Sequence, residues 1–158
     1  MIAGHKKKMI TFYLVVVFFI FADRWLKWLA SHGAPDKKIL LIKNFLSFSL
    51  SKNENIAFSI PLSGPALEMA ILILLAAILI LVITKSRELG QKTAFFILIL
   101  VGGASNLYDR LSYGYVVDYF NLSFFAIFNL ADAMVTFGVL GLFFTGFRPN
   151  KGENPINQ

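Results

Sequence analysis

The chain has 158 residues, 57% of them hydrophobic and 15% aromatic, and its mean hydropathy is +0.68. These values are above those of typical soluble domains, and apolar runs close to the length of a bilayer span occur repeatedly. There is no cysteine, which excludes disulfides, thiolate nucleophiles and cysteine-based metal sites. These features predict a polytopic membrane protein.

The net charge of +6 does not indicate a nucleic-acid partner. Lys and Arg lie mainly in short segments beside the apolar runs, as orientation signals do, and no basic stripe interleaved with aromatic residues stands in a polar segment. The two histidines, His5 and His32, are far apart in the sequence, so a histidine metal site is not expected. We therefore expect no nucleic acid, no metal and no cofactor.

The first apolar run follows three lysines at residues 6–8 and covers about residues 9–30. It resembles a secretory signal peptide at first, but it continues past Asp23, has no small-residue cleavage site and is followed by further spans. We predict a retained first helix whose amino end lies in the cytoplasm.

Residues 31–65 are mixed in composition. Apolar and polar residues alternate over much of the stretch from Ile39 to Ile60, where Phe, Ile and Ser are frequent. This pattern predicts a few short strands outside the membrane, closed by Pro61 and Pro65.

Three more spans are predicted, at about residues 66–84, 93–107 and 125–147. A basic loop at residues 85–92 returns the chain to the cytoplasmic side, and residues 107–124 form an outer loop. Eight Lys and Arg residues then lie in cytoplasmic segments and five in outer segments, so both termini are expected inside. The predicted fold is a membrane all-α single domain with four transmembrane helices, both termini cytoplasmic, a small extracytoplasmic β-rich segment and the outer loop.

Two aspartates, Asp118 and Asp132, stand beside long apolar segments in a chain with only nine acidic residues. Carboxylates at membrane depth are costly, so each needs a reason to be there. Asp118 follows Val116 and Val117 in the predicted outer loop, and Asp132 is expected about two turns into the fourth span from its outer end. Both are therefore expected at about the same depth, near the outer surface.

Two carboxylates brought within hydrogen-bond reach at low dielectric share one proton. The ionised member can take a proton from water while the protonated member polarises a peptide carbonyl, and the roles then exchange. This is the chemistry of an aspartic protease, and it needs no metal. The alternative is structural: Asp118 caps a turn, and Asp132 pairs with a basic residue between helices.

Four polar residues are candidates to support this pair. Asn129 precedes Asp132 by three residues and can hold a carboxylate or a substrate carbonyl, although asparagine is also common at a helix start. Asn106 and Asp109 share a face in the same way at the outer end of the third span. Arg110, beside them, can bind a carboxylate, a peptide carbonyl or a lipid phosphate.

Asp23 and Lys27 are spaced i, i+4 near the outer end of the first helix, so they face the same way. A stabilising pair and a role in substrate or lipid contact both remain open. Asn53 lies in the region of the predicted strands, where by itself it is an ordinary turn asparagine. Gly102 and Gly103 would let a neighbouring helix or an extended substrate approach closely.

Together these stretches resemble lipoprotein signal peptidase, the type II signal peptidase of bacteria. Asp23 and Lys27 match the family's Asp-x-x-x-Lys, and NENIAF at residues 53–58 matches Asn-x-Gly-x-Ala-Phe. SNLYDRLSYGYVVDY at residues 105–119 matches Gly-Asn-x-x-Asp-Arg-x-x-x-Gly-x-Val-x-Asp-Phe, and FNLAD at residues 128–132 matches Phe-Asn-x-Ala-Asp. The matches occur in the family's order and cover nearly the whole chain.

The resemblance implies an aspartyl endopeptidase, multi-pass in the bacterial cytoplasmic (inner) membrane, with its active site near the outer face. It would remove the signal peptide of prolipoproteins immediately before a cysteine that carries diacylglycerol, with Asp118 and Asp132 as the catalytic residues. The residues it implies as binding substrate or supporting the site are Asn53, Asn106, Asp109, Arg110, Asn129, Asp23 and Lys27. Membrane lipid is the other expected partner, and we expect a monomer.

The chain departs from the family pattern at Asn55 and Ser105, where glycine is usual, and its connection from Asp118 to Asp132 is shorter than usual. Two other functions stay open: a small membrane transporter that relays protons through the same carboxylates, and an inactive homologue. A relay needs ionisable residues spaced through the membrane thickness, whereas these cluster at the outer end.

Overall fold

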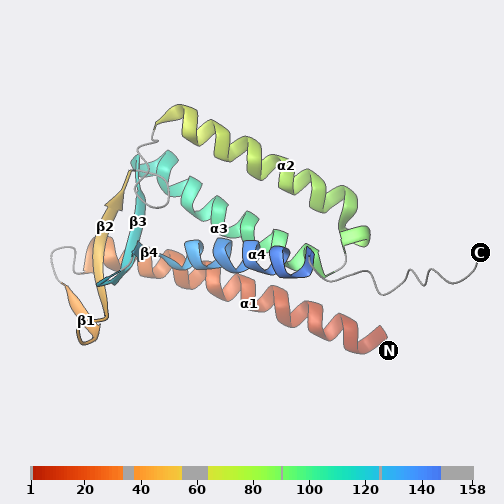
Figure 1. Cartoon of the computed structure of the whole chain (residues 1–158), viewed down its shortest axis with the longest axis horizontal. Coiled ribbons are helices and arrows are strands. Elements are labelled where there is room, and N and C mark those ends of the chain that lie inside the picture. The colour runs from red at the N-terminus through yellow and green to blue at the C-terminus, as the bar shows by residue number, and fades with distance from the viewer. Residues whose placement is uncertain (1, 34–37, 55–63, 90, 125, 147–158) are drawn as a thin grey trace, which may run out of the picture.

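The computed structural model describes residues 2–33, 38–54, 64–89, 91–124 and 126–146. Its helices are α1 (Ile2–Trp28), continued by a π-helical turn η1 (Leu29–Gly33), α2 (Pro65–Leu89), α3 (Lys92–Tyr113) and α4 (Leu130–Gly146). Its strands are β1 (Ile39–Ile42), β2 (Leu46–Asn53), β3 (Val116–Leu122) and β4 (Ile127–Phe128). The helices run roughly alongside one another, and the sheet stands across one end of them (Figure 1).

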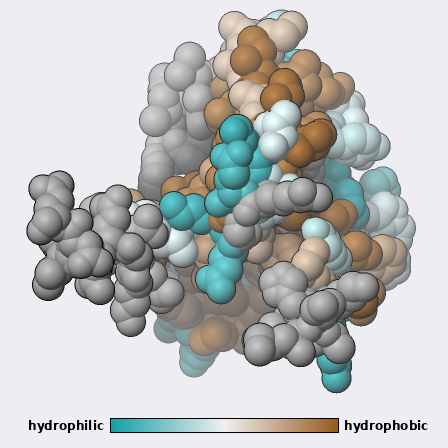
Figure 2. All heavy atoms as spheres, turned by 90° about the vertical axis from the view of Figure 1, so that its right-hand side faces the viewer, coloured by the Kyte–Doolittle hydropathy of each residue, from teal (hydrophilic) through white to brown (hydrophobic). Residues whose placement is uncertain are grey.

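Among the described residues, three helical segments are long and apolar enough to cross a membrane: Met9–Gly33, Pro65–Ser86 and Lys92–Tyr113. Helix α4 is also apolar but has only 17 residues. Large apolar side chains on the helices face outward, such as Phe18, Leu72 and Phe137. Seen from the end opposite the sheet, hydrophobic residues cover much of the sides of the helices (Figure 2). Such extensive apolar exposure is expected of helices surrounded by lipid.

Glycines bring α3 and α4 into close contact. A Cβ atom on Gly102 would collide with the backbone oxygen of Ala131, and one on Gly138 would lie 2.7 Å from the backbone oxygen of Phe95. A Cβ on Gly103 would instead meet the Leu75 side chain of α2 at 2.7 Å. Because small residues allow this approach in a membrane, both predicted glycine notches receive a neighbouring helix.

The sheet is antiparallel with strand order β1-β2-β3-β4. The two strands β1 and β2 fall in the segment where alternation predicted strands. Residues 55–63, which include Asn55 and Pro61, lie outside the described residues, and Pro65 begins α2 rather than closing a strand.

The outer loop predicted at residues 107–124 is wrong. Helix α3 continues to Tyr113 and ends where Gly114 adopts a left-handed conformation, with φ of 80°, which glycine tolerates without steric cost. The chain then forms β3, which pairs with β2. Valines and aromatic residues dominate β3, and these favour a half-buried strand.

The fourth helix also begins later than the predicted residue 125. Ile127 and Phe128 pair with β3 as strand β4, and the helix starts at Leu130. A polar residue at position 129 marks the start, because asparagine accepts hydrogen bonds from the first free helical amides. The predicted end at residue 147 lies outside the described residues.

Several polar side chains are buried at the end of the molecule where the sheet lies. The polar or charged residues buried there are Asp23, Lys27, Ser47, Asp109, Asp118 and Asn129. A small apolar cluster of Ala30, Phe48, Val117 and Tyr119 packs beside them under the sheet. Burying polar groups is favourable only when their hydrogen bonds are satisfied, so the partners of these side chains decide what the site can do.

Candidate active site

Asp118 lies on β3 and is 1% exposed. Its Oδ2 accepts a hydrogen bond of 2.9 Å from Nδ2 of Asn53, at the end of the neighbouring strand β2. Its Oδ1 accepts one of 2.6 Å from Nδ2 of Asn129. Residues 53 and 129, far apart in the sequence, therefore hold the two oxygens of one carboxylate.

Asp132 lies in the first turn of α4, not about two turns inside it as predicted, because β4 takes up the residues that were assigned to the helix. Its backbone N–H donates to Oδ1 of Asn129 at 2.8 Å, and the Asn129 N–H donates back to Oδ2 of Asp132 at 3.2 Å. This reciprocal pair is a capping box. The other oxygen of Asp132 accepts a hydrogen bond of 2.7 Å from Nδ2 of Asn106.

Asn129 therefore connects the two carboxylates. Its side-chain amide donates to Asp118, and its backbone N–H donates to Asp132. The same amide nitrogen lies 3.2 Å from Oδ1 of Asn106 and 3.4 Å from the Val117 backbone oxygen. Asn129 is thus both the ordinary helix-start residue and the residue that places Asp118 next to the first turn of α4.

Electrostatics keep a proton on the aspartate pair, Asp118 and Asp132. Burial first and the negative charge of Asp132 second raise the pKa of Asp118 to about 6, against hydrogen bonds from Asn53 and Asn129 and the charge of Lys27, which lower it. Two carboxylates coupled in this way titrate as a unit. The arrangement can therefore hold one shared proton at a higher pH than an ordinary aspartate does, up to about pH 6.

Lys27 is 3% exposed and links α1 to α3. Its Nζ lies 2.7 Å from Asp109 Oδ2, 2.9 Å from Asn106 Oδ1 and 3.3 Å from Asp23 Oδ2. The i, i+4 pair with Asp23 is present as the spacing indicated, but it is one part of a larger network. Removing one member of a buried ion pair leaves the others uncompensated, at a cost of about 3–5 kcal/mol.

Asp109 is fully buried and ties α3 to two other elements. Its carboxylate accepts from Arg24 Nη2 at 2.5 Å and from the backbone N–H of Val117 at 3.2 Å, in addition to Lys27. The contact with Val117 holds the start of β3 one residue before Asp118. Asp109 therefore supports the position of Asp118 without touching it.

Arg110 is half-buried near the end of α3. Its positive charge acts on Asp132 and Asp118, and more weakly on Asp109. The predicted cation of this region therefore lies near the aspartate pair.

Three residues that contact the predicted site were not selected from the sequence as members of it. Arg24 pairs with Asp109, Ser105 donates to Asp23 at 2.7 Å, and the hydroxyl of Tyr119 donates to Asp23 at 3.0 Å. Arg24 and Tyr119 adjoin Asp23 and Asp118 in the sequence. That adjacency was the available signal, but only the fold shows which way their side chains point.

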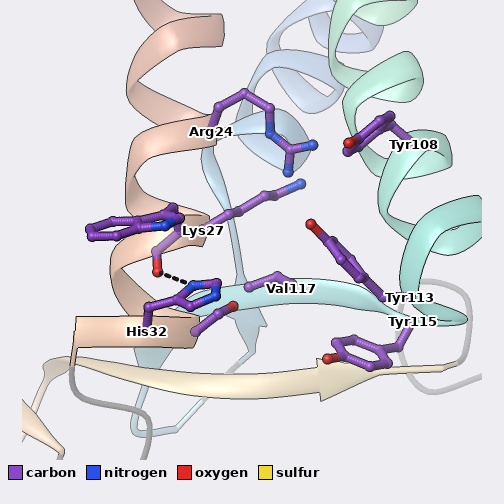
Figure 3. Close-up of a pocket in the computed structure, with 9 residues that line it drawn as sticks. Arg24, Lys27, His32, Tyr108, Tyr113, Tyr115 and Val117 are labelled. Carbon is purple, nitrogen blue, oxygen red and sulfur yellow. Dashed lines mark hydrogen bonds between the residues drawn. The ribbon is translucent and has the colours of Figure 1, made fainter.

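A cavity of about 450 Å³ lies beside the supporting network. Arg24 and Lys27 of α1 point toward Tyr108 of α3 across it, and Val117 of β3 lies at its base (Figure 3). His32 also lines it and donates from Nδ1 to the Trp28 backbone oxygen at 3.2 Å. Neither member of the aspartate pair lines this cavity. The cavity therefore adjoins Arg24 and Lys27 of the supporting network, and not the pair itself.

The family model described as signal peptidase (SPase) II matches residues 15–148. The chain belongs to the signal peptidase II family. The match begins inside α1 and extends beyond the end of α4, so it includes every residue predicted for the site.

Curated relatives agree with this membership in the signal peptidase II family. A lipoprotein signal peptidase of Clostridium novyi is 33% identical over 136 residues, covering 82% of this chain and 92% of the relative. One from Chlorobaculum parvum is 34% identical over 151 residues, covering 86% and 94%. A solved bacterial membrane enzyme superposes with a TM-score of 0.76 at 25% identity, over 90% of this chain and 93% of that one.

Proposed function

We propose that this protein is the aspartyl endopeptidase that removes the signal peptide from prolipoproteins immediately before the diacylglyceryl-modified cysteine. The observation that carries the proposal is the double role of Asn129, which donates to the buried Asp118 and caps the helix turn that holds Asp132. Family membership supplies the class of substrate.

The aspartate pair supplies both proton-transfer groups. The ionised carboxylate takes a proton from the attacking water, and the protonated one donates to the carbonyl of the scissile peptide bond. The carboxyl that took the proton from water then gives it to the leaving amine as the C–N bond breaks. The other carboxylate regains its proton from a hydroxyl of the tetrahedral intermediate, so the pair returns to its starting state. The raised pKa of Asp118 helps the pair to keep its shared proton at the start.

The polar residues around the pair act by position. Asn53 and Asn129 fix the two oxygens of Asp118, and Asn106 fixes one oxygen of Asp132. Lys27 holds Asn106 in place from the other side. Arg110 supplies positive charge near the pair and is suited to bind a backbone carbonyl or a lipid phosphate of the substrate.

The substrate's lipid explains why such a site stands at one end of membrane helices. Two acyl chains keep the modified cysteine at the level of the lipid headgroups, and their burial supplies binding energy that positions the scissile bond. We place that end of the molecule at the outer face of the cytoplasmic membrane, with α4 as the fourth span and both termini on the cytoplasmic side. The monomer is the working unit.

A proton-relaying transporter is less well supported. Its carboxylates would be spaced along the helices, whereas the buried Asp23, Asp109 and Asp118 lie together beside the sheet. An inactive homologue is also disfavoured, because both aspartates that the resemblance implies as catalytic, Asp118 and Asp132, are present.

A cleavage assay tests the proposal. Purified protein in detergent micelles is given a diacylglyceryl-modified prolipoprotein, and products are separated by gel shift, with a chelator added to one wild-type sample. Wild type is expected to cleave with and without the chelator. Asp118→Asn and Asp132→Asn each remove a proton-transfer group and are expected to lower kcat by about 10⁴-fold or more.

Asp36→Asn is the matched control, since it makes the same chemical change outside the aspartate pair. If both active-site variants still cut, the assignment of the pair is wrong. If wild type does not cut the lipidated substrate, the transporter and the inactive homologue become the leading functions.

A further inference from the structure

Two hydroxyl groups in this chain converge on one buried carboxylate. Ser105 Oγ donates to Oδ2 of Asp23 at 2.7 Å, and Tyr119 Oη donates to Oδ1 at 3.0 Å. Asp23 is 1% exposed and Tyr119 is fully buried. The motif match places Ser105 where the family pattern has glycine, and Tyr119 where it has phenylalanine. Both hydroxyls are thus additions of this chain to the pattern, and they come from different elements.

The carboxylate they hold also contacts the start of α4. Oδ1 of Asp23 accepts from the backbone N–H of Ala131 at 3.3 Å, and Tyr119 Oη accepts from the backbone N–H of Leu130 at 2.9 Å. These amides belong to the first turn of the helix, whose N–H groups have no partner inside the helix. Asp23 and Tyr119 therefore complete the cap from outside, next to the capping box of Asn129.

The same carboxylate adjoins the cation that reaches the aspartate pair. Lys27 Nζ lies 3.3 Å from Asp23 and 3.5 Å from Ser105 Oγ. It also donates to Asn106, which in turn donates to Asp132. Two routes, through the first turn of α4 and through Lys27, thus connect Asp23 to the carboxylate of Asp132.

Burial raises the pKa of the Tyr119 phenol above its ordinary value, and the charge of Asp23 adds to this effect. The phenol therefore keeps its proton and stays a donor to Asp23 while its oxygen accepts from Leu130. A phenylalanine at this position would leave the Leu130 amide without this acceptor, and Asp23 with one donor fewer.

We propose that Ser105 and Tyr119 are positioning residues of the peptidase, which orient Asp23 and through it set the first turn of α4 and the place of Asp132. This rests on the proposed function for its effect on cleavage, but not for its effect on the helix. The two substitutions toward the family pattern, Tyr119→Phe and Ser105→Gly, remove only the hydroxyls and the Ser105 Cβ, and the melting temperature of each variant measures their effect on folding.

The first experiment measures hydrogen–deuterium exchange of residues 128–135 in micelles. In Tyr119→Phe the Leu130 and Ala131 amides are expected to exchange about tenfold faster, which corresponds to the loss of one hydrogen bond. Tyr113→Phe, which removes an exposed hydroxyl beyond the network, is expected to leave them unchanged. Unchanged exchange in Tyr119→Phe overturns the proposal, whatever the enzyme cleaves.

The second experiment separates positioning from stability. With lipidated substrate, Tyr119→Phe and Ser105→Gly are each expected to lower kcat by about tenfold with KM within twofold, because the substrate-binding surface is untouched. Ser105→Thr keeps the hydroxyl and is expected to have the kcat of the wild type. Ser112→Gly makes the same change at an exposed position of α3 and controls for lost helix propensity.

The double variant is expected to be less than additive, since both hydroxyls act through Asp23. Variants with a lowered melting temperature but wild-type kcat would show a purely structural role and overturn the proposal. Absence of cleavage by wild type would contradict the proposed function alone, because the exchange experiment does not depend on it.

Discussion

At the scale of single residues, Asn129 has two tasks that can be separated. Its side-chain oxygen caps α4 by accepting from the Asp132 N–H, and its side-chain nitrogen donates to Asp118. A serine at this position can still accept the capping hydrogen bond, but its short side chain cannot reach across to Asp118. The cap and the contact with Asp118 should therefore respond differently to one substitution.

Asn129→Ser is expected to keep the melting temperature close to wild type, because serine and asparagine are similar N-caps. It is expected to lower kcat by about a hundredfold, as the loss of one oriented donor in an active site does. Asn129→Ala should lose the cap as well, which costs about 1 kcal/mol. Thermal unfolding and steady-state cleavage measure the two effects. Full activity of Asn129→Ser would contradict the role given to its amide.

The pH dependence follows from Asp118. Its pKa is raised from 3.8 to about 6, by burial first and by Asp132 second. A raised carboxyl pKa means that the folded protein holds the proton more tightly than the unfolded chain, so this contribution to stability is present below pH 3.8 and is lost as the pH rises through about 6. Because the proposed mechanism needs the shared proton, activity should fall over the same rise in pH.

Asn53→Ala removes a hydrogen bond that lowers the pKa of Asp118. The alkaline limb of the kcat profile is therefore expected to move to higher pH, with the charges of Lys27, Arg110 and Asp132 unchanged around it. Asn121→Ala, the same substitution on β3, controls for the loss of an amide from the sheet. A shift of the limb to lower pH in Asn53→Ala would contradict this account of the titration.

At the scale of elements, the contact of α3 with α4 carries Asp132 as well as the fold. Gly102 of α3 lies against the backbone of Ala131, one residue before Asp132. A methyl group at Gly102 would push the first turn of α4 away from α3, because the obstacle is backbone and not a flexible side chain. The distance from Asn106 on α3 to Asp132 on α4 depends on the same contact.

Gly102→Ala is expected to lower stability by about 1–3 kcal/mol, the usual cost of overpacking, and to lower kcat even at temperatures where the protein is fully folded. Gly146→Ala is the control, since a Cβ at Gly146 meets no atom within 4 Å. Unfolding in denaturant and cleavage of lipidated substrate are the measurements. Equal behaviour of the two variants would mean that the close approach at Gly102 has no effect on Asp132.

The boundaries of elements show where local patterns reach their limit. The length of the apolar run predicted the position of α3 but not its end at Tyr113. The last turns of the helix contain the polar residues Asn106, Asp109 and Arg110, which interrupt the apolar pattern. The segment predicted as a loop after α3 contains the strand β3. This strand was missed because it pairs with β2, and the paired residues are more than sixty positions apart in the sequence. Strand pairing of that separation leaves no trace in a local window.

At the scale of the whole molecule, the direction of the chain across the membrane can be tested by labelling introduced cysteines. The chain has no cysteine of its own, so no other residue of it reacts with a thiol reagent. Ser112 is exposed at the sheet end of α3, and Ser86 is exposed near the opposite end of α2. The proposed topology places these two serines on opposite sides of the membrane.

In spheroplasts, a membrane-impermeant maleimide is expected to label Ser112→Cys directly and Ser86→Cys only after permeabilisation. Both variants replace one small exposed side chain, so each is the control of the other for reactivity. Labelling in the reverse order would place the sheet and the aspartate pair on the cytoplasmic side. A lipid-anchored substrate would then be presented at the other face.

Composition and apolar run length by themselves predicted a membrane protein with several spans, and the resemblance of its motifs indicated the signal peptidase II family, because hydropathy and short motifs are local properties of a chain. They also named Asp118, Asp132 and Asn129. Only the tertiary structure decided how these residues meet: that Asp118 stands on a paired strand, and that Asp132 lies in the first turn of α4. It also decided that Ser105 and Tyr119 reach Asp23, since the direction of a side chain depends on how distant elements pack.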